Sequence, residues 1–125
     1  MVTPTTLTVE QVAKACYDVN HVYCRHVFKQ HTWPTWDKAP LWRRDSMLVG
    51  VNNIFYSSRP IGAEENHINW CDFRTANGWT FGLNVDARNK RHPALVPFNE
   101  LSKIQRTKHL IFVTLVQELL ASTSG

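Results

Sequence analysis

An apolar segment near the C-terminus, residues 104–120, constrains the fold more than any other feature of this sequence. Drawn as a helix, it places apolar side chains on most sides: Leu110, Ile111, Phe112, Val113, Leu115, Val116, Leu119 and Leu120. A helix of this kind needs cover from several neighbouring elements. Ser102 and Gln105 have the spacing of a capping box that would start it. We therefore expect a central buried helix, with the rest of the chain packed around it.

Two helices are expected in the first half of the chain. Thr8 and Gln11 form another capping-box pattern, and apolar residues at helical spacing continue this helix to about residue 28. A second helix begins near Pro40, because proline is favoured at the first helical position. Gly50 in this helix is a tolerated flaw that we expect to admit the backbone of another element.

The chain changes from helix to short extended pieces after residue 62. A helix is expected over residues 63–76, because Asn77-Gly78 provides a strong C-terminal stop. Alternating aromatic and small residues predict a short strand over residues 79–82, followed by a turn over residues 84–90. Two prolines four positions apart exclude a helix over residues 92–98.

Length and composition indicate one globular domain, residues 1–125, with 43% hydrophobic and 19% charged residues. No stretch reaches the roughly 20 apolar residues of a membrane span, so we expect a soluble protein with no membrane partner. The N-terminus lacks the basic and apolar run of a secretory signal, which favours a cytoplasmic location, the host cytoplasm if the gene is viral. Cys16 and Cys24 would lie about 12 Å apart on one helix, too far for a disulfide, so reduced thiols are expected.

No catalytic sequence motif is present. The nucleophile elbow, the phosphate loop, the dinucleotide fingerprint and the zinc-protease motif are all missing. His67 and Cys71 are four residues apart on one expected helix, but two further metal ligands at a suitable spacing are lacking. We therefore expect a protein that is not an enzyme and that uses no metal or cofactor.

Aromatic and cationic residues alternate between residues 64 and 98. The candidate ligand-binding residues are Asn66, Trp70, Arg74, Arg88, Lys90 and Arg91. Bases stack on aromatic rings, and guanidinium groups hold phosphate oxygens in bidentate pairs, so this mixture suits a nucleotide. The residues alone favour a plainer alternative, in which the aromatic side chains fill a small core and the basic residues form a solvated turn.

Three motifs stand out between residues 63 and 120: Glu65-Asn66-His67-Ile68-Asn69-Trp70, Asn77-Gly78-Trp79-Thr80-Phe81-Gly82 and His92-Pro93-Ala94-Leu95-Val96-Pro97-Phe98. Together they resemble the ryanodine-receptor repeat (RyR) domain family. Phe81 and Phe98 stand where that family has tyrosine, so hydrogen bonds made by those hydroxyls are lost. Residues 18–24 and 36–46 resemble the stand-alone versions of the domain in tailed bacteriophages and bacteria.

The resemblance implies a mainly α (α+β) fold, with about four helices and a small two- or three-stranded β-sheet. Residues 63–120 would be the family core, and residues 8–58 an N-terminal helical extension. It also implies adenine-nucleotide binding between paired repeats, which a single copy would reproduce as a homodimer. By resemblance, Trp70 stacks on the base and Asn66 reads the polar edges of base or ribose, while the phosphates meet Arg74, Arg88, Lys90 and Arg91.

The resulting hypothesis is non-catalytic binding of an adenine- or ADP-ribose-like nucleotide, including cyclic signalling nucleotides. In a viral protein, such binding would sequester a messenger of a bacterial immune system. The alternative is a protein-interaction module that uses Trp33, Trp36 and Trp42 as an aromatic anchor, because tryptophan is enriched at binding hot spots. Nucleic-acid binding ranks last, because the net charge of +4 is modest and no basic stripe follows a helix.

Overall fold

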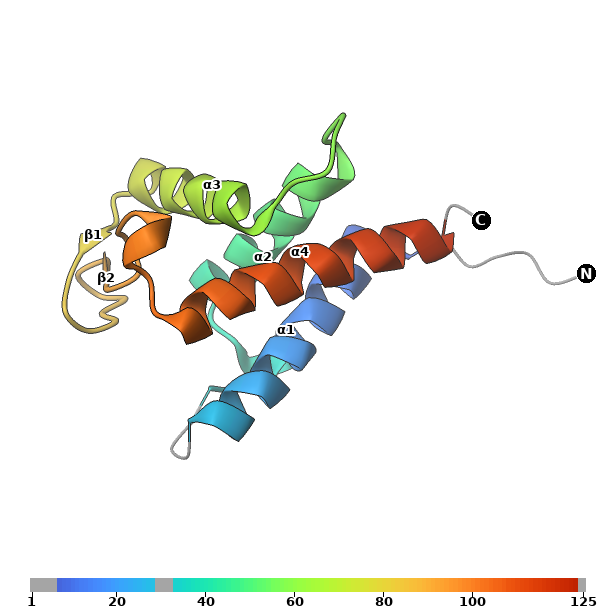
Figure 1. Ribbon diagram of the computed structural model, residues 1–125. Coiled ribbons are helices and arrows are strands. Elements are labelled where there is room, and N and C mark those ends of the chain that lie inside the picture. The colour runs from blue at the N-terminus through green and yellow to red at the C-terminus, as the bar shows by residue number, and fades with distance from the viewer. Residues whose placement is uncertain (1–6, 29–32, 124–125) are drawn as a thin grey trace, which may run out of the picture.

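Four α-helices and a two-stranded parallel sheet form the part of the chain that this computed structural model describes, residues 7–28 and 33–123 (Figure 1). The helices are α1 (Val9–Val27), α2 (Leu41–Phe55), α3 (Ala63–Ala76) and α4 (Lys103–Thr123). The strands are β1 (Thr80–Phe81) and β2 (Arg91–His92), and short 3-10 helices cover Trp36–Lys38 and Phe98–Glu100. The expected mainly helical fold with a small sheet is confirmed.

The helices begin close to the predicted positions. The Thr8 hydroxyl accepts a hydrogen bond from the Gln11 backbone N–H, and the Gln11 side chain accepts one from the Thr8 N–H, which confirms the capping box. At the start of α4, the Ser102 hydroxyl accepts a hydrogen bond from the Gln105 N–H at 3.2 Å. Pro40 is the N-cap of α2, with ψ of 153°, so this helix begins one residue after it.

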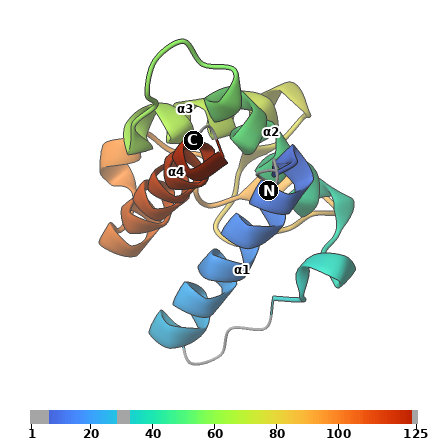
Figure 2. The same ribbon diagram turned by 90° about the vertical axis from the view of Figure 1, so that its right-hand side faces the viewer.

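Helix α4 lies between α3 on one side and α1 on the other (Figures 1 and 2). The hydrophobic core contains Val12, Ala13, Cys16, Tyr17, Trp36, Ala39, Val51, Ile54, Ile61, Val113 and Val116. α4 is central, as expected, but it is not buried on every side, because Leu110 is 56% exposed. Its apolar residues serve two interior surfaces, since Val113 and Val116 join the core while Ile111 lines a cavity described below.

Gly50 admits an aromatic side chain, not the backbone that the sequence led us to expect. A Cβ atom at this position would lie 3.0 Å from Cζ of Phe112. The missing side chain on α2 therefore lets the Phe112 ring of α4 approach the α2 backbone, which brings two helices together beside the cavity.

Helix α3 ends in a hydrogen-bonded turn that places Trp79. Gly78 has φ of +87°, a left-handed conformation that glycine adopts without steric cost. The Gly78 N–H donates to the Thr75 carbonyl and the Trp79 N–H donates to the Arg74 carbonyl, both at 3.0 Å, which is the Schellman motif. The predicted stop at residues 77–78 is thus confirmed, and the strand that follows is shorter than predicted.

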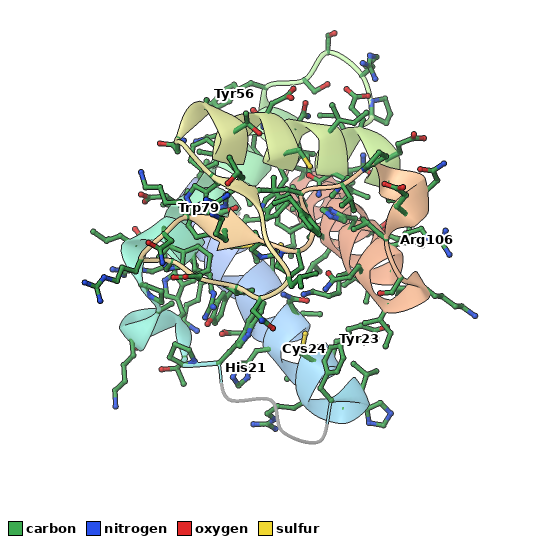
Figure 3. The ribbon with its side chains drawn as sticks, turned by 90° about the vertical axis from the view of Figure 1, so that its left-hand side faces the viewer. His21, Tyr23, Cys24, Tyr56, Trp79 and Arg106 are labelled. Carbon is green, nitrogen blue, oxygen red and sulfur yellow. The ribbon has the colours of Figure 1, made fainter. Side chains whose placement is uncertain are left out.

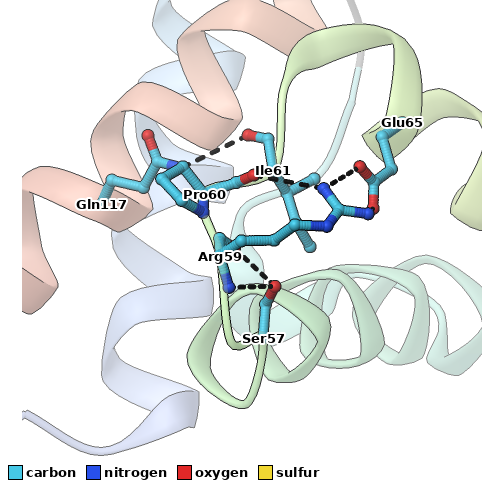
Figure 4. A network of polar contacts seen from close by, with 6 residues as sticks. All are labelled: Ser57, Arg59, Pro60, Ile61, Glu65 and Gln117. Atoms are coloured by element: carbon cyan, nitrogen blue, oxygen red, sulfur yellow. Dashed lines mark hydrogen bonds and ion pairs between the residues drawn. The ribbon is translucent and has the colours of Figure 1, made fainter.

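The connection between α2 and α3 is fastened to both α3 and α4 (Figure 4). The Arg59 guanidinium donates two hydrogen bonds to the Glu65 carboxylate, at 2.7 and 2.9 Å. The Gln117 side chain of α4 donates to the Ile61 carbonyl at 3.3 Å. The exposed ion pair adds little stability on its own, but the contacts together fix where α3 starts relative to α4.

Tyr17 gives a direct test of this packing, because its hydroxyl donates a 2.5 Å hydrogen bond to the Pro34 carbonyl from within the core. Tyr17→Phe should lower the free energy of unfolding by about 1–2 kcal/mol, since the carbonyl loses its partner. Tyr56→Phe is the matched control, because Tyr56 is 82% exposed, and it should change stability by less than about 0.5 kcal/mol. Urea denaturation measures both; equal effects would contradict the packing described for Tyr17.

Candidate functional site

A partly open cavity of about 180 Å³ is lined by side chains from all four helices. Its walls combine indole rings, cationic groups and amides. The side chains that matter most for its chemistry are Trp42 and Arg43 of α2, Asn66, Trp70 and Arg74 of α3, and Lys108 of α4.

Three of the six predicted ligand-binding residues line this cavity. Asn66, Trp70 and Arg74 follow one another at intervals of four residues, so α3 presents them on one face, about 6 Å apart along its axis. Trp70 is half-buried, and its ring lies at 4.9 Å from the His92 ring, edge to face. The helical spacing in the sequence is therefore what brings these three side chains together.

The other three predicted residues lie elsewhere at the surface: Arg88 and Lys90 on the turn between the strands, and Arg91 at the start of β2. Arg88 is exposed, the Lys90 ammonium donates to the Asn77 carbonyl at 2.9 Å, and the Arg91 guanidinium donates to the Thr80 hydroxyl at 2.6 Å. None of them lines the cavity. The turn folds back through two hydrogen bonds between the backbones of Asp86 and Arg91, which keeps its cationic side chains at the surface.

Arg74 is the most unusual group at the site, because its side chain is charged and only 2% exposed. Its guanidinium donates to the Trp42 carbonyl at 2.6 Å and lies 5.0 Å from the ring centres of both Trp42 and Trp79. Burial, and next the nearby Arg43, lower the pKa of Arg74 to about 10, which still leaves it charged at neutral pH. Its Nε–H has no hydrogen-bond partner among the described residues.

Aromatic rings surround this guanidinium. Trp79 is buried, packs at 5.1 Å from Trp42, and is seen among the side chains between the sheet and α2 in Figure 3. Trp70 lies 5.9 Å and Phe73 lies 5.6 Å from the Arg74 guanidinium. Cation–π contacts of this kind compensate part of the cost of removing the charge from water.

Two further cations line the cavity, and sequence reasoning did not assign either of them to the site. The Arg43 guanidinium lies 4.3 Å from the Trp33 ring and 4.8 Å from the Trp42 ring. The Lys108 ammonium lies 4.8 Å from the Trp33 ring, and burial lowers its pKa. The sequence gives no local signal for Lys108, because it lies among polar and charged residues in the first turns of α4.

No aspartate or glutamate is among the residues that line the cavity. Three cations therefore face a space whose lining contains no carboxylate, and Asp45, which acts on Arg74, lies outside that lining. Attraction between opposite charges is strengthened in such a partly desolvated site, so the cavity favours an anion. The surrounding indoles favour a flat ring beside that anion.

Histidines form a hydrogen-bonded row along one wall. The Asn66 amide nitrogen lies 2.9 Å from His109 Nδ1, His109 Nε2 lies 3.1 Å from His67 Nδ1, and His67 Nε2 lies 2.7 Å from the Val96 carbonyl oxygen. His92 stands apart, and its Nδ1 accepts a hydrogen bond from the Ala94 N–H at 3.0 Å.

Two of these histidines resist protonation. Burial, then the neighbouring cations Arg74, Lys108 and Arg43, lower the pKa of His92 to about 4. Burial, then His67 and Lys108, lower the pKa of His109 to about 3. Both rings are therefore neutral at pH 7 and can offer hydrogen bonds without adding charge.

The cysteines and possible metal ligands of the described residues complete the chemistry of the site region. All three cysteines are free, as predicted. Burial raises the pKa of Cys16 to about 12, and burial together with Asp72 raises that of Cys71 to about 11, which disfavours the nucleophilic thiolate. Within residues 7–28 and 33–123, no group of three or more His, Cys, Asp or Glu side chains could hold a metal ion. Over the same ranges, no helix combines the length and apolarity needed to cross a membrane.

The two histidine pKa values predict how stability depends on pH. An unfolded histidine takes up a proton near pH 6.5, whereas His92 and His109 stay neutral in the folded state down to about pH 4 and 3. The unfolded state therefore binds more protons below pH 6.5, and stability is present above that pH and is lost as pH falls. Each histidine should cost about 2 kcal/mol between pH 7 and pH 5.

Urea denaturation at several pH values measures this loss. His109→Gln should make the dependence on pH shallower, because one of the two titrating groups is gone. His26→Gln, at an exposed position on α1, should leave the dependence unchanged. A stability that is constant between pH 7 and pH 5 would contradict the burial of both rings.

Comparison with known families agrees with this architecture. The sequence matches the RyR domain over residues 47–122, which is more than half of the chain. The matched region takes in the second part of α2, all of α3, both strands and nearly all of α4, so it contains most of the cavity wall. The chain therefore belongs to the RyR domain family.

Proposed function

We propose that this protein binds a nucleotide-type ligand, adenine- or ADP-ribose-like, in the cavity and does not catalyse a reaction on it. One observation carries the proposal: three cations and several indoles line a cavity to which no carboxylate contributes. A buried cation without an anion is costly, and an anionic ligand would offset that cost. The Nε–H of Arg74 has no acceptor in the described protein, but it is closed to solvent, as is the equally unpartnered Nε of Arg44 outside the lining, so the proposal rests on the charges and rings of the cavity.

Each wall of the cavity suits one part of such a ligand. Trp70 would stack on the base, and Arg74, Arg43 and Lys108 would hold the phosphates through charge-assisted hydrogen bonds. The volume of about 180 Å³ is smaller than most ligand sites, which span roughly 300–1,000 Å³. The cavity would therefore enclose the base and the first phosphates, and the rest of a larger messenger would extend out of it.

Binding without turnover suits a protein that sequesters a signal. If the chain is encoded by a bacteriophage, as the resemblance to the stand-alone proteins suggests, its ligand would be a messenger of a bacterial immune system. The homodimer and the cytoplasmic location remain predictions. The cavity is lined within one chain, so the proposed binding does not require a second copy.

The alternatives lose support once the tryptophans are placed. Trp36 is only 5% exposed and belongs to the hydrophobic core, so it cannot serve as a surface anchor for another protein. Trp33 and Trp42 both contact the Arg43 guanidinium at the cavity. Nucleic-acid binding would use exposed cations such as Arg88, Lys90 and Arg91, whereas Arg43, Arg74 and Lys108 converge on the cavity.

Calorimetry with a panel of nucleotides tests the proposal. We expect saturable binding of at least one among ADP, ATP, cyclic ADP-ribose and cyclic dinucleotides. Trp70→Ala should weaken that binding by about 1–3 kcal/mol, the contribution of one ring stacked on one base. Lys108→Met keeps the length of the side chain but removes its charge, and should cost about 1.5–3 kcal/mol.

Lys90→Met is the matched control for Lys108→Met. Lys90 was a candidate from the sequence, but it lies on the exposed turn outside the cavity, so its substitution should leave affinity nearly unchanged. Circular dichroism of each variant checks that the fold is kept. Folded protein that binds none of the nucleotides would overturn the proposal, and so would a loss of affinity in Lys90→Met that equals the loss in Lys108→Met.

A further inference from the structure

The row of hydrogen bonds along the cavity wall has a fixed direction, and its starting point is the Val96 carbonyl. A carbonyl oxygen only accepts, so His67 Nε2, 2.7 Å away, must carry a proton. His67 is 1% exposed and no carboxylate pairs with it among the described residues, so a second proton on Nδ1 would leave an unpaired buried charge. The Nδ1 of a neutral His67 is therefore an acceptor.

The acceptor at His67 Nδ1 fixes the donors and acceptors of His109 and Asn66, the next two residues of the row. His109 Nε2 lies 3.1 Å from His67 Nδ1 and must donate to it. His109 Nδ1 is then the unprotonated nitrogen of a neutral ring, and it accepts from the Asn66 amide nitrogen at 2.9 Å. The amide NH₂ of Asn66 is thus committed to the protein, which fixes the orientation of the amide group.

The side-chain oxygen of Asn66, Oδ1, is left without a partner in the described protein. Asn66 is 8% exposed and lines the cavity, and no described residue donates a hydrogen bond to its Oδ1. The amide cannot turn over to present NH₂ to a ligand without breaking the row at His109. Asn66 can therefore accept a hydrogen bond from a ligand through Oδ1, but its NH₂ group is not free to donate one.

We propose that Asn66 makes this cavity selective for a ligand whose group at the α3 wall is a hydrogen-bond donor, such as the exocyclic amine of an amino-substituted base. A carbonyl oxygen at the same place would face Oδ1, and two acceptors repel each other. Asn66 precedes Trp70 by one helical turn, so both side chains line the same wall; one face of the indole packs on the His67 ring at 5.8 Å, and a base would stack on the other face, beside the amide. This selectivity rests on the proposed function, because it concerns the same cavity.

His67 and His109 act here as positioning residues. They touch Asn66 directly or through each other, and they hold its amide in one orientation. The row links α3, α4 and the extended segment at Val96, so the selectivity is built into contacts between elements that are distant in sequence.

Calorimetry with three ligands that share ribose and diphosphate tests the selectivity. ADP carries a 6-amino group, purine riboside 5′-diphosphate has no substituent there, and IDP carries a 6-oxo group. ADP should bind about tenfold more tightly than either of the other two, the factor that one hydrogen bond supplies. In Asn66→Ala, the ratio between ADP and purine riboside diphosphate should fall to about one.

A second measurement does not depend on any ligand or variant. Long-range ¹H–¹⁵N correlation spectra of the free protein at pH 7 should show neutral His67 and His109, both with the proton on Nε2. Equal affinity for the three nucleotides, tighter binding of IDP, or a proton on Nδ1 of either histidine would overturn the selectivity while leaving the proposed function in place. Absence of binding by all three, with the cyclic messengers also failing, would overturn both.

Discussion

The burial of the Arg74 guanidinium is the constraint on which the rest of the site depends. A charged group that is 2% exposed has lost nearly all of its water. In place of water, the guanidinium donates one hydrogen bond to the Trp42 carbonyl and lies against several aromatic faces. No carboxylate pairs with it within the described ranges. The charge of the Arg74 guanidinium is therefore not neutralised by an ion pair, and an anion in the adjoining cavity would neutralise it.

Local features of the chain hold that guanidinium in place. The Schellman turn at Gly78 folds the chain back so that the Trp79 amide bonds the Arg74 carbonyl while the Trp79 ring covers the Arg74 side chain. α2 supplies the opposite wall, because Trp42 contributes both its carbonyl and its ring. The C-terminal end of α3 and the neighbouring α2 therefore enclose the Arg74 guanidinium, and α4 adds Lys108 to the cavity lining.

The sequence predicted the parts of this site that follow from local periodicity. Asn66, Trp70 and Arg74 recur every four residues, which predicts that they lie on one face of a helix. The Asn-Gly pair at residues 77–78 predicts where that helix ends. Arg88, Lys90 and Arg91 are near them in sequence, but the turn and the start of β2 place these three side chains at the surface. Proximity along the chain is a poor guide once a turn intervenes.

Tertiary contacts account for what the sequence could not predict. Arg43 of α2 and Lys108 of α4 are 65 positions apart in the sequence, and no local pattern predicts that they line the same cavity. The direction of the histidine row depends on a single carbonyl, that of Val96, whose position is set by the packing of an extended segment. The apolar sides of α4 predict a central buried helix, whereas part of this apolar surface lines the cavity and Leu110 is exposed.

The side-chain Nε–H of Arg74 reports most directly on the central claim that an anionic ligand completes the cavity. Its signal can be followed in ¹H–¹⁵N spectra while ADP is added to the folded protein. We expect a saturable shift of the Arg74 Nε–H signal at one ligand per chain, with the signals of Arg88 and Arg91 unchanged. An Arg74 signal that stays in place while the nucleotide binds, or a shift confined to Arg88 and Arg91, would contradict it.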